Sequence, residues 1–157
     1  MSAKTKGWIY VLLQVIMILS VILLSVKDYL GMIPYNYTFR VTGFVMIITG
    51  AVLMITQILT FIRFGQIMSP NPVPPESYKL VQTGFYKFIR HPMYSAALFA
   101  LLGVVVFYHS ASGFIAWYLG VLFVLWKIRF EEKSLQEKFP EYKEYQGKTK
   151  KLIPYLY

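Results

Sequence analysis

The sequence predicts an all-α integral membrane protein with about four transmembrane helices, the last two forming a helical hairpin, and a cytosolic C-terminal helical segment. Of the 157 residues, 57% are hydrophobic and only 15% are charged, whereas soluble domains carry about 25% charged residues. Long stretches are apolar on every face, which is typical of segments surrounded by lipid. Because this length allows one domain and little more, we expect residues 1–157 to form a single membrane domain.

Four apolar segments predict the membrane spans, at about residues 8–26, 41–62, 93–108 and 113–126. The first is an uncharged stretch of 19 residues, which as a helix crosses a hydrocarbon core of about 30 Å. A cleaved signal peptide would have a shorter apolar region and a small-residue cleavage site, so we expect this segment to remain as a helix. Residues 109–113 are uncharged and turn-forming, which favours a tight helical hairpin between the last two spans.

The distribution of lysine and arginine predicts the orientation in the membrane. With four spans and both termini cytosolic, 14 of the 16 basic residues lie on the cytosolic side, as the positive-inside rule requires. This bias also accounts for the net charge of +9, so we expect no nucleic-acid partner. The protein is predicted to be a multi-pass protein of a bacterial or archaeal cell membrane, or of the endoplasmic reticulum in a eukaryote.

Several classes of site are excluded or disfavoured by the composition. The chain has no cysteine, which excludes disulfides, zinc-thiolate sites, iron–sulfur clusters and thiol catalysis. His91 and His109 lie far apart and outside any HExxH pattern, so we expect no metal site. Neither GxGxxG nor GxxxxGK[ST] occurs, so neither a Rossmann nor a P-loop nucleotide site is available.

The third span begins with features of a helix N-terminus. Pro92 suits the first helical position and places His91 at the cap. Unpaired backbone N–H groups at such an end attract anions, and Arg90 adds a full charge. The alternative is an arginine–histidine pair that only faces lipid headgroups. Ala96 and Ala100 form a small-xxx-small pattern, which permits close helix packing.

The second cytosolic segment, residues 127–157, begins as a continuation of the fourth span. Its apolar side chains share one helical face; they are Ile128, Leu135, Phe139 and Tyr142. Glu131 points into this face and Glu132 lies beside it, although buried carboxylates are costly unless paired. The alternative is purely structural, with Lys127 pairing with Glu131 and Arg129 with Glu132 along the helix.

The first cytosolic segment, residues 63–92, contains a proline-rich stretch at residues 69–75. Its fixed φ angles exclude helix, so we expect a stiff strap across the membrane face. Together the two cytosolic segments offer positive charge at a helix N-terminus, two carboxylates and several tyrosines. A ligand that fits would carry both charge signs and an aromatic portion.

Five sequence blocks resemble the isoprenylcysteine carboxyl methyltransferase and phospholipid methyltransferase group of integral membrane methyltransferases. They are Tyr78-Lys-Leu-Val-Gln-Thr-Gly-Phe-Tyr86, Arg90-His-Pro-Met-Tyr94, Arg129-Phe-Glu-Glu-Lys-Ser-Leu135, Phe139-Pro-Glu-Tyr-Lys-Glu-Tyr145 and Ile153-Pro154. The resemblance covers about half of the chain. Its motifs are specific in combination, although Arg-His-Pro-x-Tyr alone is weak.

The resemblance implies S-adenosylmethionine as the methyl donor, bound between the start of the third span and the C-terminal helical segment. The implied cofactor-binding residues are Tyr78, Lys79, Leu80, Val81, Tyr86, His91, Pro92, Met93, Tyr94, Glu131 and Glu132. We expect Glu131, Arg90 and Arg129 to form the catalytic group. Arg129 would meet the substrate, and Lys127 competes for that role.

The expected partners are membrane lipids and a hydrophobic acceptor that enters from the bilayer. A prenylcysteine carboxylate, a phospholipid amine and a small thiol all remain open as acceptors. Two other functions also remain: an NADPH-dependent membrane reductase of the sterol-reductase type, and a non-catalytic membrane interaction module. The reductase would bind the reduced dinucleotide in place of S-adenosylmethionine, and the module would bind neither.

Overall fold

The computed structural model of the protein describes residues 2–31, 36–64 and 69–156. Within these residues the chain forms five α-helices and one short 3-10 helix. They are α1 (Ala3–Leu30), α2 (Tyr37–Arg63), η1 (Gly84–Lys87), α3 (Pro92–Tyr108), α4 (Ala111–Lys138) and α5 (Tyr142–Lys148).

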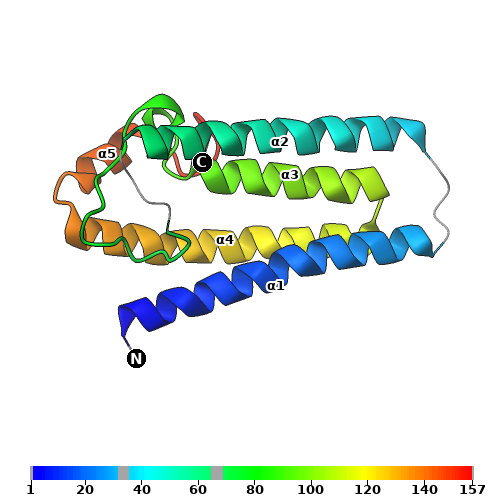
Figure 1. Cartoon of the computed structure of the whole chain (residues 1–157), viewed down its shortest axis with the longest axis horizontal. Coiled ribbons are helices and arrows are strands. Elements are labelled where there is room, and N and C mark those ends of the chain that lie inside the picture. Colours follow the sequence, from blue (N-terminus) through cyan, green and yellow to red (C-terminus); the bar gives the residue numbers. More distant parts are fainter. Residues whose placement is uncertain (1, 32–35, 65–68, 157) are drawn as a thin grey trace.

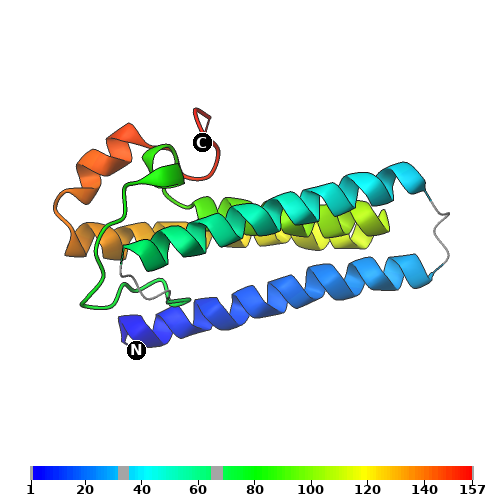
Figure 2. The ribbon, with the colours of Figure 1, turned by 45° about the horizontal axis from the view of Figure 1, so that its top comes forward.

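The four long helices form two antiparallel pairs, α1 with α4 and α2 with α3 (Figure 1). Helix α3 also packs against α4 and α1, so it joins the two pairs. Residues 69–91 and α5 lie at one end of this bundle, together with both ends of the described chain (Figures 1 and 2). We call this the α5 end. The α3–α4 connection lies at the opposite, far end.

All four predicted spans are helical, which confirms the all-α class. Helices α1, α2 and α4 are long and apolar enough to cross a membrane, and they extend beyond the predicted boundaries at both ends. Helix α3 is a shorter apolar helix of 17 residues, and its length of about 26 Å falls slightly short of a hydrocarbon core. Large apolar side chains on the outer faces of the long helices are exposed, as expected for surfaces that face lipid.

Both predicted ends of the third span, and the predicted start of the fourth, lie within two residues of those observed. Pro92 opens α3 and His91 is its N-cap, as predicted. The hairpin turn is shorter than predicted, because only His109 and Ser110 lie between α3 and α4. The backbone of His109 is left-handed, with φ 50°. The Ser110 hydroxyl caps α4 by accepting the Gly113 N–H at 2.8 Å, which allows the helix to begin earlier.

The two helices of the α2–α3 pair approach each other closely where glycines line their contact. A Cβ atom at Gly43 would lie 2.3 Å from the backbone nitrogen of Phe107. A Cβ at Gly50 would lie 2.9 Å from the carbonyl oxygen of Ala96 and 2.7 Å from the Cβ of Ala100. The close packing predicted from the two alanines is therefore confirmed, and its partner is α2.

Gly43→Ala is expected to lower the free energy of unfolding by about 1–3 kcal/mol, because the added methyl forces the α2 and α3 backbones apart. The matched control is Gly147→Ala in α5, where nothing lies within 4 Å of an added Cβ. This control should be neutral or stabilising by up to about 1 kcal/mol. Unfolding in mixed detergent micelles measures both, and equal stability of the two variants would contradict the packing.

The C-terminal segment after α5 returns to the start of α3. The Arg90 N–H donates to the Lys150 carbonyl at 2.8 Å, and the Ser95 hydroxyl donates to the Leu152 carbonyl at 2.6 Å. The Leu152 side chain is buried in a core shared by α3 and α4. These contacts fix α5 and the chain that follows it over the N-terminus of α3.

Candidate functional site

A cavity of about 250 Å³ lies at the α5 end of the bundle, lined by α1 to α5, by residues 69–75 and by the loop around η1. It contains nine of the predicted site residues. They are Tyr78, Leu80, Val81, Tyr86, Arg90, His91, Met93, Tyr94 and Glu131. The structure therefore brings together, around one cavity, residues that lie more than 50 positions apart in the sequence.

Four predicted site residues lie outside the lining of this cavity. Lys79 is exposed between lining residues, and Pro92 is buried in the first turn of α3. Glu132 is buried on the side of α4 that faces Arg90. Arg129 is exposed on α4 and does not reach the cavity.

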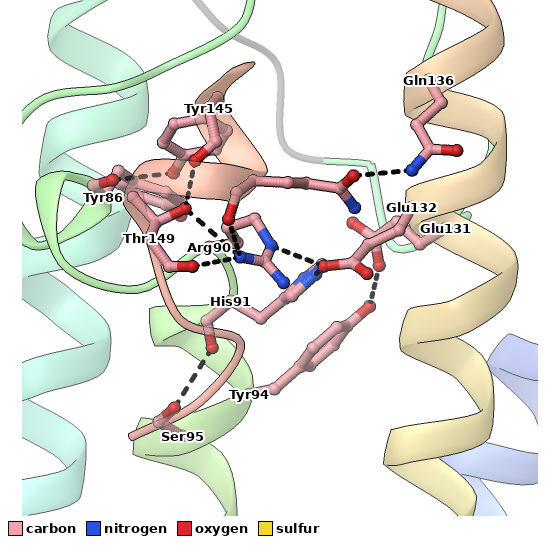
Figure 3. Close-up of polar contacts among 11 residues, drawn as sticks. Tyr86, Arg90, His91, Tyr94, Ser95, Glu131, Glu132, Gln136, Tyr145 and Thr149 are labelled. Carbon is pink, nitrogen blue, oxygen red and sulfur yellow. Dashed lines mark hydrogen bonds and ion pairs between the residues drawn. The ribbon is translucent and has the colours of Figure 1, made fainter. Parts of the chain in front are cut away.

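A buried ion-pair network joins α3 to α4 beside the cavity (Figure 3). The Arg90 Nε donates to Glu132 Oε1 at 2.6 Å, and the two side chains are 7% and 9% exposed. The same Glu132 oxygen lies 3.3 Å from His91 Nε2. The predicted alternative pair of Arg129 with Glu132 is wrong, because Glu132 pairs with Arg90 and His91 from the segment just before α3.

The guanidinium group of Arg90 also holds the C-terminal segment. Its Nη1 donates to the carbonyl oxygens of Gln146, at 3.2 Å, and of Thr149. The Thr149 hydroxyl lies 3.3 Å from the same nitrogen. Arg90 thus connects the start of α3 to α4 and to the residues after α5, which fixes one wall of the cavity.

Glu131 lies one position before Glu132 and lines the cavity. The Tyr94 hydroxyl donates to its Oε2 at 2.6 Å, as Figure 3 shows. A carboxylate has about four acceptor positions, so Glu131 can accept further hydrogen bonds from a ligand. The predicted alternative pairing with Lys127 is wrong, since these two described side chains lie outside the 4 Å limit of an ion pair. Lys127 instead donates to Gln14 and Pro70.

Four tyrosines from outside the spans line the cavity; they are Tyr78, Tyr86, Tyr142 and Tyr145. Burial raises the pKa of each phenol above its usual range, so the hydroxyls stay protonated at neutral pH. The Tyr145 hydroxyl donates to the Tyr86 carbonyl at 2.7 Å. The Tyr142 hydroxyl is buried and has no protein partner. An orphaned hydroxyl at a cavity wall is suited to bond a polar group of a ligand.

Residues 69–75 form the non-helical strap that the prolines predicted, and they line one side of the cavity. The Asn71 amide donates to the Lys4 carbonyl at 3.1 Å, which attaches the strap to the start of α1. The Lys138 ammonium donates to the carbonyls of Pro75 and Glu76 at the other end. The strap is thus held against both α1 and α4.

Several lining residues were not predicted as site residues, because they lie inside the predicted spans. They are Gln14 in α1, Met54 and Phe61 in α2, and Ala97 in α3. A signal existed for Gln14, since a polar side chain inside a membrane span is costly and is a functional candidate by default. The three apolar residues carry no comparable signal.

The lining chemistry fits a ligand with both charge signs and an aromatic portion. Glu131 supplies acceptor oxygens, Lys127 and His91 supply donors, and the tyrosines supply flat aromatic faces. Among the described residues, no group of three or more His, Cys, Asp or Glu side chains is placed to hold a metal ion.

Comparison with known proteins gives two matches. Residues 38–142 match the phospholipid methyltransferase family. Over 143 residues the chain is 30% identical to protein-S-isoprenylcysteine O-methyltransferase B of Arabidopsis thaliana, covering 85% of this chain and 72% of that relative. No solved structure matches the chain significantly. The chain therefore belongs to the phospholipid methyltransferase family of membrane methyltransferases.

Proposed function

We propose that this methyltransferase uses S-adenosylmethionine to methylate a hydrophobic acceptor at the membrane surface. The observation that carries the proposal is a cavity that is lined by nine of the predicted site residues. The buried, unpartnered Tyr142 hydroxyl adds an independent reason to expect a polar ligand there. When bound, the cofactor supplies a methyl group activated on a sulfonium.

We assign the described residues distinct roles toward that cofactor. Glu131 accepts hydrogen bonds from the hydroxyl or amino groups of the cofactor, since it lines the cavity with oxygens to spare. The tyrosines form the wall for the adenine ring. His91 and the N-terminus of α3 face the carboxylate end. Arg90 is a positioning residue, because its guanidinium is engaged with Glu132 and the C-terminal segment.

Methyl transfer from a sulfonium depends mainly on alignment of the nucleophile with the methyl group, so few catalytic side chains are needed. The cavity is lined both by the strap outside the spans and by residues inside α1, α2 and α3. This position suits a water-soluble donor and an acceptor that arrives from the bilayer. The name of the Arabidopsis relative indicates a prenylated cysteine as one acceptor class. We place this end of the protein in the cytosol from the distribution of basic residues.

Calorimetric titration of the detergent-purified protein tests the proposal. Saturable binding of S-adenosylmethionine is expected, and no saturable binding of NADPH. NADPH binding alone would favour a reductase. Binding of neither, in protein shown to be folded by circular dichroism, would favour a non-catalytic module. Methyl transfer to prenylcysteine and phospholipid acceptors would then be measured with a radiolabelled methyl group.

A further inference from the structure

Lys127 is a buried cation that the proposed cofactor roles do not use. Its side chain lies in α4 with 1% exposure and lines the cavity. A lysine buried at this level is costly unless its charge is compensated. Its partners therefore decide whether the charge is already satisfied inside the protein.

The hydrogen-bond partners of Lys127 are all neutral. Its ammonium donates to the side-chain oxygen of Gln14 in α1 and, at 3.5 Å, to the carbonyl of Pro70 in the strap. It also lies 5.2 Å from the centre of the Tyr94 ring. No described carboxylate approaches within the 4 Å limit of an ion pair. These contacts orient the ammonium but form no ion pair with it, and the Glu131 carboxylate acts on its charge only from a longer distance.

The nearest candidate counter-charge, Glu131, lies one turn further along α4. The step of four positions from Lys127 to Glu131 corresponds to about 6 Å along the helix axis. The Tyr94 hydroxyl binds the Glu131 carboxylate, while the face of its ring lies toward Lys127. The wall of the cavity therefore carries a negative charge at Glu131 and a positive charge at Lys127. Lys127 lies closer to the centre of the membrane span.

We infer that Lys127, oriented by Gln14, binds the carboxylate of the methyl acceptor and makes the enzyme specific for an anionic nucleophile. This inference rests on the proposed function and deepens it. A terminal carboxylate is ionised at neutral pH, whereas a free thiol with a pKa of about 8.5 is mostly neutral. A lipid ammonium would be repelled by the fixed cation. Arg129, by contrast, is exposed and outside the cavity.

The chemistry balances without a proton acceptor. A carboxylate oxygen of the acceptor forms a bond to the methyl carbon while the bond from that carbon to sulfur breaks. The electron pair of the broken bond stays on the sulfur, so the sulfonium becomes a neutral thioether and the carboxylate becomes a methyl ester. No proton is released, which agrees with a site whose charged group beside the nucleophile is a cation.

The neutrality of Gln14 is part of this arrangement. An amide oxygen orients the ammonium without neutralising it, whereas a carboxylate at the same position would form an ion pair and compete with the substrate. Gln14 is therefore a positioning residue. We expect Gln14→Glu to raise the KM for a carboxylate acceptor at least about 30-fold, while the protein stays folded and still binds S-adenosylmethionine.

Equilibrium binding of a matched pair of ligands tests the role of Lys127. The ligands are N-acetyl-S-farnesyl-cysteine and its carboxamide, titrated with and without S-adenosylhomocysteine. In the unmodified protein the carboxylate should bind at least about 30-fold more tightly, since pairing with a buried charge is worth 2 kcal/mol or more. Lys127→Gln should remove this preference and Lys127→Arg should largely restore it. The control is Lys133→Gln, an exposed lysine of the same helix.

An unchanged carboxylate preference in Lys127→Gln would overturn the inference. The inference would also be overturned if the unmodified protein methylated phosphatidylethanolamine as efficiently as the carboxylate ligand. Loss of S-adenosylmethionine binding in Lys127→Gln, with the ligand preference kept, would place Lys127 on the cofactor and also overturn it. Failure of the unmodified protein to bind S-adenosylmethionine would instead contradict the proposed function. The ligand pair titrated without cofactor still tests Lys127 in that case.

Discussion

Arg90→Gln is expected to lower the free energy of unfolding by about 3–5 kcal/mol, because it leaves the Glu132 carboxylate buried without its cation. The substitution also removes the donor to the carbonyls of Gln146 and Thr149. The segment after α5 should therefore detach from α3. Unfolding in mixed micelles measures the stability, and limited proteolysis after residue 145 measures the detachment.

The matched control removes an ion pair that lies in solvent. Lys148 and Glu144 pair in α5 with side chains 70% and 71% exposed. Lys148→Gln should therefore change the stability by at most about 0.5 kcal/mol. If Arg90→Gln were as stable as this control and equally resistant to protease, Arg90 would not hold α4 and the segment after α5 together. That result would favour a direct role of Arg90 at the substrate.

Glu131→Gln is expected to weaken S-adenosylmethionine binding about 10- to 100-fold while the protein stays folded. Replacing the carboxylate by a neutral amide weakens charge-assisted hydrogen bonds, which contribute about 1.5–3 kcal/mol each. The fold should survive, because the amide oxygen can still accept the hydrogen bond that Tyr94 donates to Glu131 at 2.6 Å. Calorimetric titration measures the affinity, and circular dichroism checks the helix content.

Glu137→Gln provides the comparison, since Glu137 is an exposed carboxylate on the same helix. It changes the net charge of the protein by the same amount as Glu131→Gln and should leave the dissociation constant within about twofold. Unweakened binding by Glu131→Gln would remove Glu131 from the cofactor site. Equal weakening of both variants would mean that the overall charge at the α5 end, and not Glu131 itself, controls affinity.

The lengths of the apolar segments and the position of Pro92 were sufficient to predict most of the fold. The four spans follow from the need to satisfy backbone hydrogen bonds within lipid, and the start of α3 at Pro92 follows from its fixed φ angle. The helical period also placed Glu131 on the inner face of α4, where it lines the cavity. The predicted break at residues 109–113 was too long because the Ser110 cap was not recognised.

The membrane class, the helix positions and the blocks that identify the family could all be predicted from the amino-acid sequence. Which side chains meet depends on how the helices pack, and this could not be predicted. The helical period predicted that Glu132 would pair with Arg129 of the same helix. In the structure Glu132 pairs instead with Arg90, which lies just before α3, at 2.6 Å. The packing also brought Gln14 to Lys127, 113 positions later in the chain. Helical periodicity fixes the face of a side chain, whereas its partner depends on the register between helices, which close contacts such as Gly43 against Phe107 set.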